Sequence, residues 1–83
     1  MGNYDAAIVT LRRSLELAPD NVMALLNLGL TDVDGDIDID KAIRLFECAL
    51  AFDAIGSNPF PRGAYHGRIS EALVDAIERN AAK

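Results

Sequence analysis

The sequence contains two segments that repeat the same apolar pattern at an offset of about 35 residues. The segment that opens at residue 5 with D-A-A-I aligns with the one that opens at residue 40 with D-K-A-I. In both, apolar or small residues recur at i, i+4, i+7 and i+8, the spacing of one face of an α-helix. These positions are Ala7, Leu11, Ser14 and Leu15 in the first segment and Ala42, Phe46, Ala49 and Leu50 in the second. A repeated amphipathic helix predicts an all-α fold of about four helices, stacked as helix-turn-helix repeats.

Helix-breaking and helix-capping residues bound the first two helices. Pro19 ends a helix over 4–18, because proline cannot donate the next backbone hydrogen bond. Asp20 or Asn21 then caps a second helix over 22–33. Gly29 lies in the middle of this second helix, which indicates that another helix backbone approaches closely there.

Two more helices follow in the second half of the chain. Asp38 or Asp40 caps a third helix, which runs to about Asp53. Asn58 and Pro59 are a favourable N-cap and first-turn pair ahead of a last helix over 62–80. Its apolar stripe consists of Tyr65, Ile69, Ala72, Leu73, Ala76 and Ile77. The residues of its opposite face are polar: Arg68, Glu71, Asp75, Glu78 and Arg79. We therefore expect this helix to cap the apolar edge of the stack.

The segment 22–54 resembles the tetratricopeptide repeat, a helix-turn-helix unit of about 34 residues. Leu25, Leu28 and Gly29 stand at the tryptophan, leucine and glycine positions of the family's first helix. The signature of its second helix is matched by Ala42, Phe46 and Ala49. The resemblance divides a single domain into the second helix of a first repeat (2–21), a full repeat (22–56) and a C-terminal capping helix (57–83). The pattern departs from the family at Asp32, where tyrosine is usual, and at Ala54, where proline is usual.

The resemblance implies a protein–protein interaction module, such as a scaffold, that has no catalytic activity. In this family the first helix of each repeat lines a concave groove, where an asparagine hydrogen-bonds the backbone of an extended peptide; that residue is Asn27 here. Met23, Leu26 and Leu30 are expected near this groove, or else buried under the last helix or a second copy.

Self-association is the alternative function. The first helix has no preceding partner helix in this sequence, so one of its sides should be open. A longer repeat array, a second copy in an oligomer such as a homodimer, or the last helix folded back could cover that side.

The acidic residues are concentrated in one turn. The chain has 13 acidic and 8 basic residues, a net charge of -5, which argues against a nucleic-acid partner. Five of the acidic residues lie at alternate positions from 32 to 40. Alternating carboxylates are typical of calcium loops, which makes calcium binding a minor alternative, with Asp32, Asp34, Asp36 and Asp38 as candidate ligands. Neither possible register supplies the loop glycine that such a site requires.

Residues that carry chemistry are few. His66 is the only histidine and Cys48 the only cysteine, so the sequence predicts no enzyme, no cofactor and no metal centre. Cys48 is expected to pack as a small residue within the third helix. The longest apolar runs, 22–26 and 48–52, are far shorter than the roughly 18 residues of a membrane span, so no membrane partner is expected. Sparse cysteine favours a reducing compartment, and we expect the cytoplasm.

Overall fold

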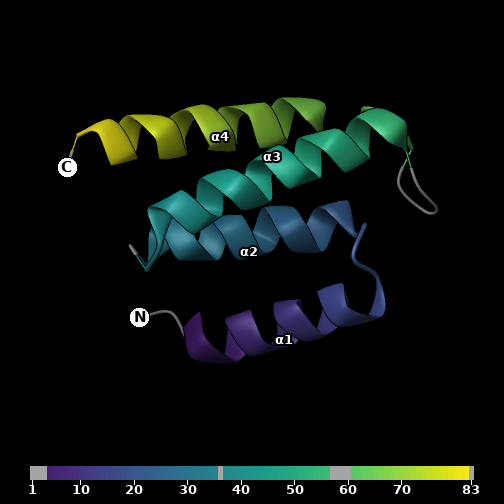
Figure 1. The fold of residues 1–83 in the computed structure, drawn as a ribbon, viewed down its shortest axis with the longest axis horizontal. Helices are drawn as coiled ribbons and strands as arrows, with labels where there is room; N and C mark the ends of the chain where they lie inside the picture. The colour runs from purple at the N-terminus through teal and green to yellow at the C-terminus, as the bar shows by residue number, and fades with distance from the viewer. Residues whose placement is uncertain (1–3, 36, 57–60, 83) are drawn as a thin grey trace.

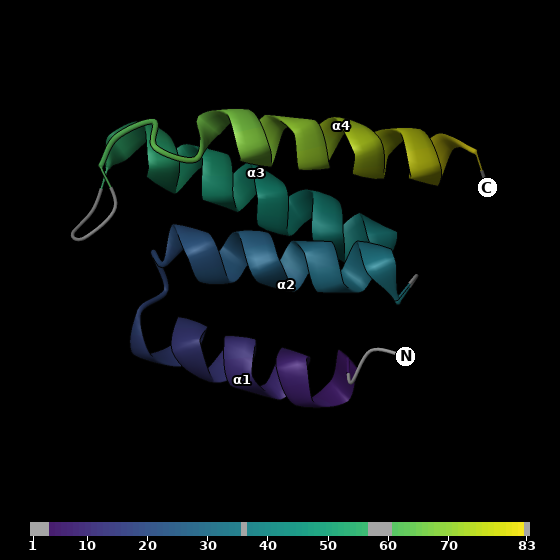
Figure 2. The same ribbon diagram turned by 180° about the vertical axis from the view of Figure 1, so that it is seen from behind.

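The computed structural model describes residues 4–35, 37–56 and 61–82, and this part of the chain forms four α-helices without strands. They are α1 (Tyr4–Leu17), α2 (Val22–Asp34), α3 (Ile39–Ile55) and α4 (His66–Ala81). Successive helices run antiparallel and lie in chain order from one edge of the molecule to the other (Figures 1 and 2). The prediction of an all-α chain of four helices is confirmed.

The four helices share one apolar core, which is centred on the α2–α3 pair. The largest fully buried side chains are those of Phe46 and Asp53 on α3, Val22 on α2 and Ile69 on α4. Within the described residues α4 packs on α3 and touches α2, whereas α1 contacts α2 alone. The last helix therefore does not fold back over the open side of the first.

Side-chain caps explain where α2 and α3 begin. The backbone N–H of Ala24 donates to Asn21 Oδ1 at 3.0 Å, and that of Lys41 donates to Asp38 Oδ1 at 3.0 Å. Asn21 and Asp38, rather than the neighbouring aspartates, are thus the N-caps. At the other end of α3, Gly56 adopts φ of 81°, a left-handed conformation that suits glycine and ends the helix.

The last helix starts at His66, so its predicted start near residue 62 is wrong. The preceding turn is held by Asp53, whose backbone oxygen accepts from the Gly63 N–H at 2.9 Å and whose Oδ1 accepts from the Tyr65 N–H at 3.1 Å. These bonds, with φ of 76° at Gly63, keep the segment out of helical geometry. The predicted cap at Asn58 and Pro59 lies outside the described residues.

The neighbour of Gly29 is a side chain, not a helix backbone as predicted. A Cβ built at Gly29 would lie less than 3.0 Å from three ring carbons of Phe46. Phe46 is fully buried, so its ring is enclosed on the other sides as well. The absence of a side chain at position 29 is therefore what lets the ring pack directly against α2.

None of the helices in the described part of the chain has the length and apolar character that crossing a membrane requires.

We expect Gly29→Ala to lower the free energy of unfolding by about 1–2 kcal/mol, because overpacking against the enclosed Phe46 ring outweighs the gain in helix propensity. Urea unfolding followed by circular dichroism measures this change.

Gly67→Ala is the matched control. Gly67 also lies in a helix, α4, but a Cβ built there meets nothing within 4 Å. This substitution should raise the free energy of unfolding by up to about 1 kcal/mol through helix propensity alone. Equal effects of the two substitutions would show that the contact between Gly29 and Phe46 does not limit packing.

Candidate binding groove

The exposed side of α2 forms the floor of a groove between α1 and α4. A hollow of about 530 Å³ lies between α1 and α2, and smaller hollows of about 200 Å³ and 290 Å³ lie toward the start of α2 and toward α4. Leu11 and Asn27 line both hollows on the α1 side, and Leu30 joins the largest one to the hollow beside α4. The three hollows are open to solvent and adjoin one another along α2, and we refer to them together as the groove.

The structure places the four residues predicted for partner binding on this groove, with different degrees of exposure. Asn27 is exposed, Met23 is 40% exposed and Leu30 is half-buried. Leu26 is buried in the core and reaches only the hollow beside α4. Leu26 is therefore primarily a packing residue, whereas the other three remain available to a ligand.

The Asn27 side-chain amide is the central polar group of the groove. Its own helix does not use it: the Thr31 hydroxyl donates to the backbone oxygen of Asn27 at 2.8 Å, not to its side chain. Within the described residues the amide makes no hydrogen bond, so both its donor and its acceptor are free. A primary amide of this kind can match the N–H and C=O of a peptide unit.

Several residues that line the groove were not predicted. α1 supplies a wall that includes Ala7 and Thr10, and α2 extends the floor with Thr31 and Asp34. Helical spacing from Asn27 could have indicated Thr31 and Asp34, which follow at i+4 and i+7. The α1 wall depends on how two helices pack, which no local pattern encodes.

The opposite edge of the groove comes from α4. Arg68 and Glu71 line the hollow next to Leu26 and Leu30. The helical spacing of α4 predicts both charged residues on its outer, polar face. The structure shows instead that they border the groove, so charged groups lie beside Leu26 and Leu30 at this edge of the floor.

The three candidate calcium ligands that the structure describes have separate environments. Asp38 caps α3, Asp34 lines the groove, Asp32 is buried in α2 and Asp36 lies outside the described residues. In the described ranges no three histidine, cysteine or carboxylate side chains come together in a group that could hold a metal ion. The geometry of these residues therefore does not support the calcium alternative.

Asp32 occupies the position where the resemblance expects tyrosine, and the residue is 3% exposed. Its Oδ2 has no hydrogen-bond partner among the described residues. Burial raises the pKa of this carboxyl, Lys41 and Arg12 act to lower it, and the negative charge of Asp38 adds to the increase. The net effect is a pKa above the ordinary value, so the fold favours the protonated form.

The single histidine and the single cysteine lie at the surface. Cys48 is exposed on α3, so the expectation that it packs inside is wrong. His66 is exposed at the first position of α4. Neither residue lines the groove along α2.

We expect Asp32→Asn to stabilise the protein at pH 7 by on the order of 1 kcal/mol, because it removes a buried charge without a full set of partners. For an acid whose folded pKa is raised, stability is lost as the pH rises through that pKa. The advantage of the variant should therefore shrink as the pH falls toward 3.8, the ordinary value.

Thermal unfolding of both proteins at several pH values measures this difference. Asp34→Asn, an exposed neighbour, is the control and should change the free energy of unfolding by less than about 0.5 kcal/mol. A lower melting temperature for Asp32→Asn at pH 7 would mean that the ionised carboxylate stabilises the fold.

Comparisons of the chain with protein-family models, with curated proteins and with solved structures found no match.

Proposed function

We propose that the chain is a protein-binding module of the tetratricopeptide repeat type, which holds an extended segment of a partner protein in the groove along α2. The observation that carries this proposal is the free amide of Asn27 at the centre of the groove floor. Apolar side chains on both sides of it, Leu11 and Leu30, supply surface that a ligand would cover.

The composition of the groove supports an extended ligand with apolar side chains. Met23, Leu30 and Leu11 give apolar contacts whose burial favours binding. Asn27 fixes the position of the ligand backbone, because a buried peptide group that loses its hydrogen bond is costly. The groove offers no dense set of charges that would select a strongly acidic or strongly basic segment; it combines Asp34 with Arg68 and Glu71.

The side chains of the groove are suited to binding. Binding uses side chains that donate, accept or pack, and all of these are present along α2. We therefore propose a role without catalysis. We further propose the cytoplasm as the location, which is supported by the use of a single cysteine, unpaired and exposed.

A peptide-display experiment tests the proposal. A library of random unstructured peptides is selected on the immobilised protein, and enriched peptides are labelled and titrated by fluorescence polarisation. We expect Asn27→Ala to weaken binding of these peptides by about 5- to 100-fold, the cost of one unsatisfied peptide group, with no loss of helicity.

Asn80→Ala is the matched control, since Asn80 is an exposed asparagine on α4 and its amide donates to Asp40 Oδ1, away from the groove. It should leave the affinity unchanged. If Asn27→Ala and Asn80→Ala bind the selected peptides equally well, or if no peptide is enriched, Asn27 is not a ligand-binding residue.

A further inference from the structure

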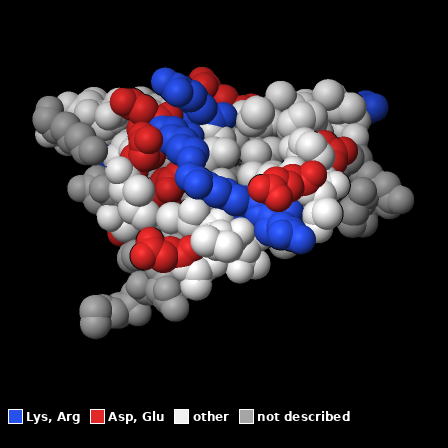
Figure 3. All heavy atoms as spheres, turned by 60° about the horizontal axis from the view of Figure 1, so that its bottom comes forward, with Lys and Arg blue, Asp and Glu red and all other residues white. Residues whose placement is uncertain are grey.

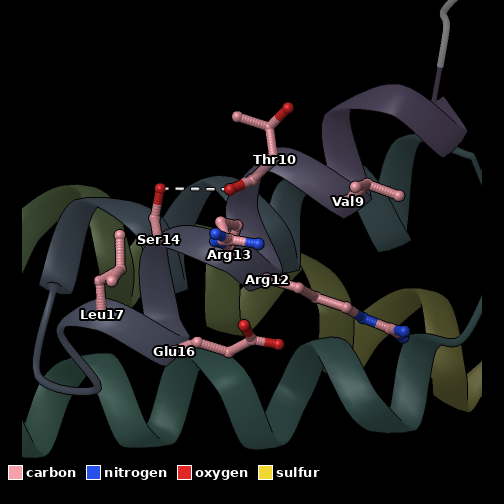
Figure 4. A pocket seen from close by; sticks show the side chains of 7 residues that line it. All are labelled: Val9, Thr10, Arg12, Arg13, Ser14, Glu16 and Leu17. Carbon is pink, nitrogen blue, oxygen red and sulfur yellow. Dashed lines mark hydrogen bonds between the residues drawn. The ribbon is translucent and has the colours of Figure 1, made fainter.

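The outer side of α1 is an apolar and cationic surface that α2 does not cover. Val9 is 68% exposed and Leu17 is 79% exposed. Figure 4 shows these two side chains at the ends of the surface, with Arg12, Arg13 and Glu16 between them. The residues that line this side all belong to α1, so the surface is open to solvent. Exposed aliphatic side chains on one face of a helix mark a surface suited to contact with another helix.

The far edge of the molecule carries a second exposed apolar stripe, on α4. Val74 is 55% exposed and Ile77 is 49% exposed, although the sequence predicted that Ile77 is part of the packed stripe. With Ser70 and Ala81 they follow a spacing of four, three and four residues, so all four lie along one side of the helix. The side that packs inward carries Ile69, Leu73 and Ala76. α4 therefore has a covered stripe and an uncovered one.

The net charges beside the two stripes are opposite in sign: two arginines and one glutamate, Glu16, lie on the outer side of α1, whereas Glu71 and Glu78 flank the α4 stripe. Arg12 and Arg13 on α1 make no ion pair in the described part of the chain. On α4, Asp75 is paired with Arg79 at 2.8 Å, which leaves the carboxylates of Glu71 and Glu78 without an ion-pair partner there. Figure 3 shows a band of cationic side chains, with acidic side chains beside it, across the face on which the α1 edge comes forward. The α1 edge can therefore attract the acidic side of α4.

The charges on the two helices favour one of the three possible contacts between two copies: α1 with α1, α4 with α4, or α1 with α4. A symmetric contact of α1 with α1 would bring together two surfaces that each carry two arginines and one glutamate, Glu16, so both sides have a net positive charge. A symmetric contact of α4 with α4 would oppose Glu71 and Glu78 in the same way. Like charges across an interface are repulsive, whereas α1 against α4 pairs arginines with glutamates.

We propose that the outer side of α1 binds the outer side of α4 of a second copy, which joins copies head to tail. This contact continues the succession within one chain, where α1 packs on α2, α2 on α3 and α3 on α4. The two helices match in length, since 14 and 16 residues span about 21 Å and 24 Å. The contact meets the groove along α2 only at its edge, where Glu71 lies, so it goes beyond the proposed peptide binding.

A head-to-tail contact uses two different surfaces, so each copy keeps one of each free and further copies add until a ring closes or a filament grows. One pair of helices is a small interface, and the association is therefore weak and concentration-dependent. Because charged pairs border it, it weakens as the salt concentration rises.

Light scattering behind a sizing column, over a range of protein concentrations, tests this contact. The wild-type mass should rise with concentration from 8.9 kDa through species larger than a dimer. Arg13→Glu and the double variant Glu71→Arg/Glu78→Arg should each require at least about tenfold higher concentration to associate. Arg44→Glu, the same change at an exposed arginine of α3, is the control and should associate as the wild type does.

Mixing the two variants gives the decisive result. Each retains one intact surface, and the reversed charges complement each other, so an equimolar mixture should associate again at the wild-type concentration. Circular dichroism checks that both variants remain helical; all substituted residues are exposed.

Three outcomes would overturn the proposal. The first is a wild-type protein that stays monomeric at every concentration. The second is stronger association of Arg13→Glu, which would indicate a symmetric α1 contact. The third is a mixture of the two variants that does not associate.

Discussion

The packing of the Phe46 ring against Gly29 determines how closely α2 and α3 approach, and the other elements depend on this pair. The ring takes the space that a side chain at position 29 would fill. α3 then provides the surface on which α4 packs, while the opposite side of α2 receives α1. The same pair orients α2 so that Asn27 faces the groove, with Leu28 and Gly29 in the core. One close contact thus underlies both the stack of helices and its candidate binding surface.

Much of the fold could be predicted because its signals are local. The repeated helical spacing identified the packed face of the third helix and, on the first, a half-buried face of which Leu15 reaches the core. Capping residues located the starts of α2 and α3 within one or two residues. The start of α4 could not be found in this way. It depends on Asp53, which holds the turn at Gly63 and Tyr65 from ten to twelve positions away. The exposure of Ile77 likewise depends on how α4 rotates against α3.

The candidate groove was predictable only along α2. Met23, Asn27 and Leu30 share a face of one helix, so their spacing indicated a common surface. The wall from α1 and the edge at Arg68 and Glu71 arise from the packing of separate helices. In the account proposed here, this groove takes a partner segment while the two outer edges of the stack join copies of the chain. The two surfaces share Glu71 at the edge of the groove, whereas the groove floor on α2 and the outer side of α1 are separate.

Native-state hydrogen exchange of dilute protein tests most directly whether the α2–α3 pair is the centre of the fold. Amides in regions with few buried contacts exchange through local opening, whereas those of the core exchange only on global unfolding. The account predicts the slowest exchange in α2 and α3 around Gly29 and Phe46, and the fastest helix exchange in α1, which contacts α2 alone. Slow exchange in α1 together with fast exchange in α2 or α3 would contradict it.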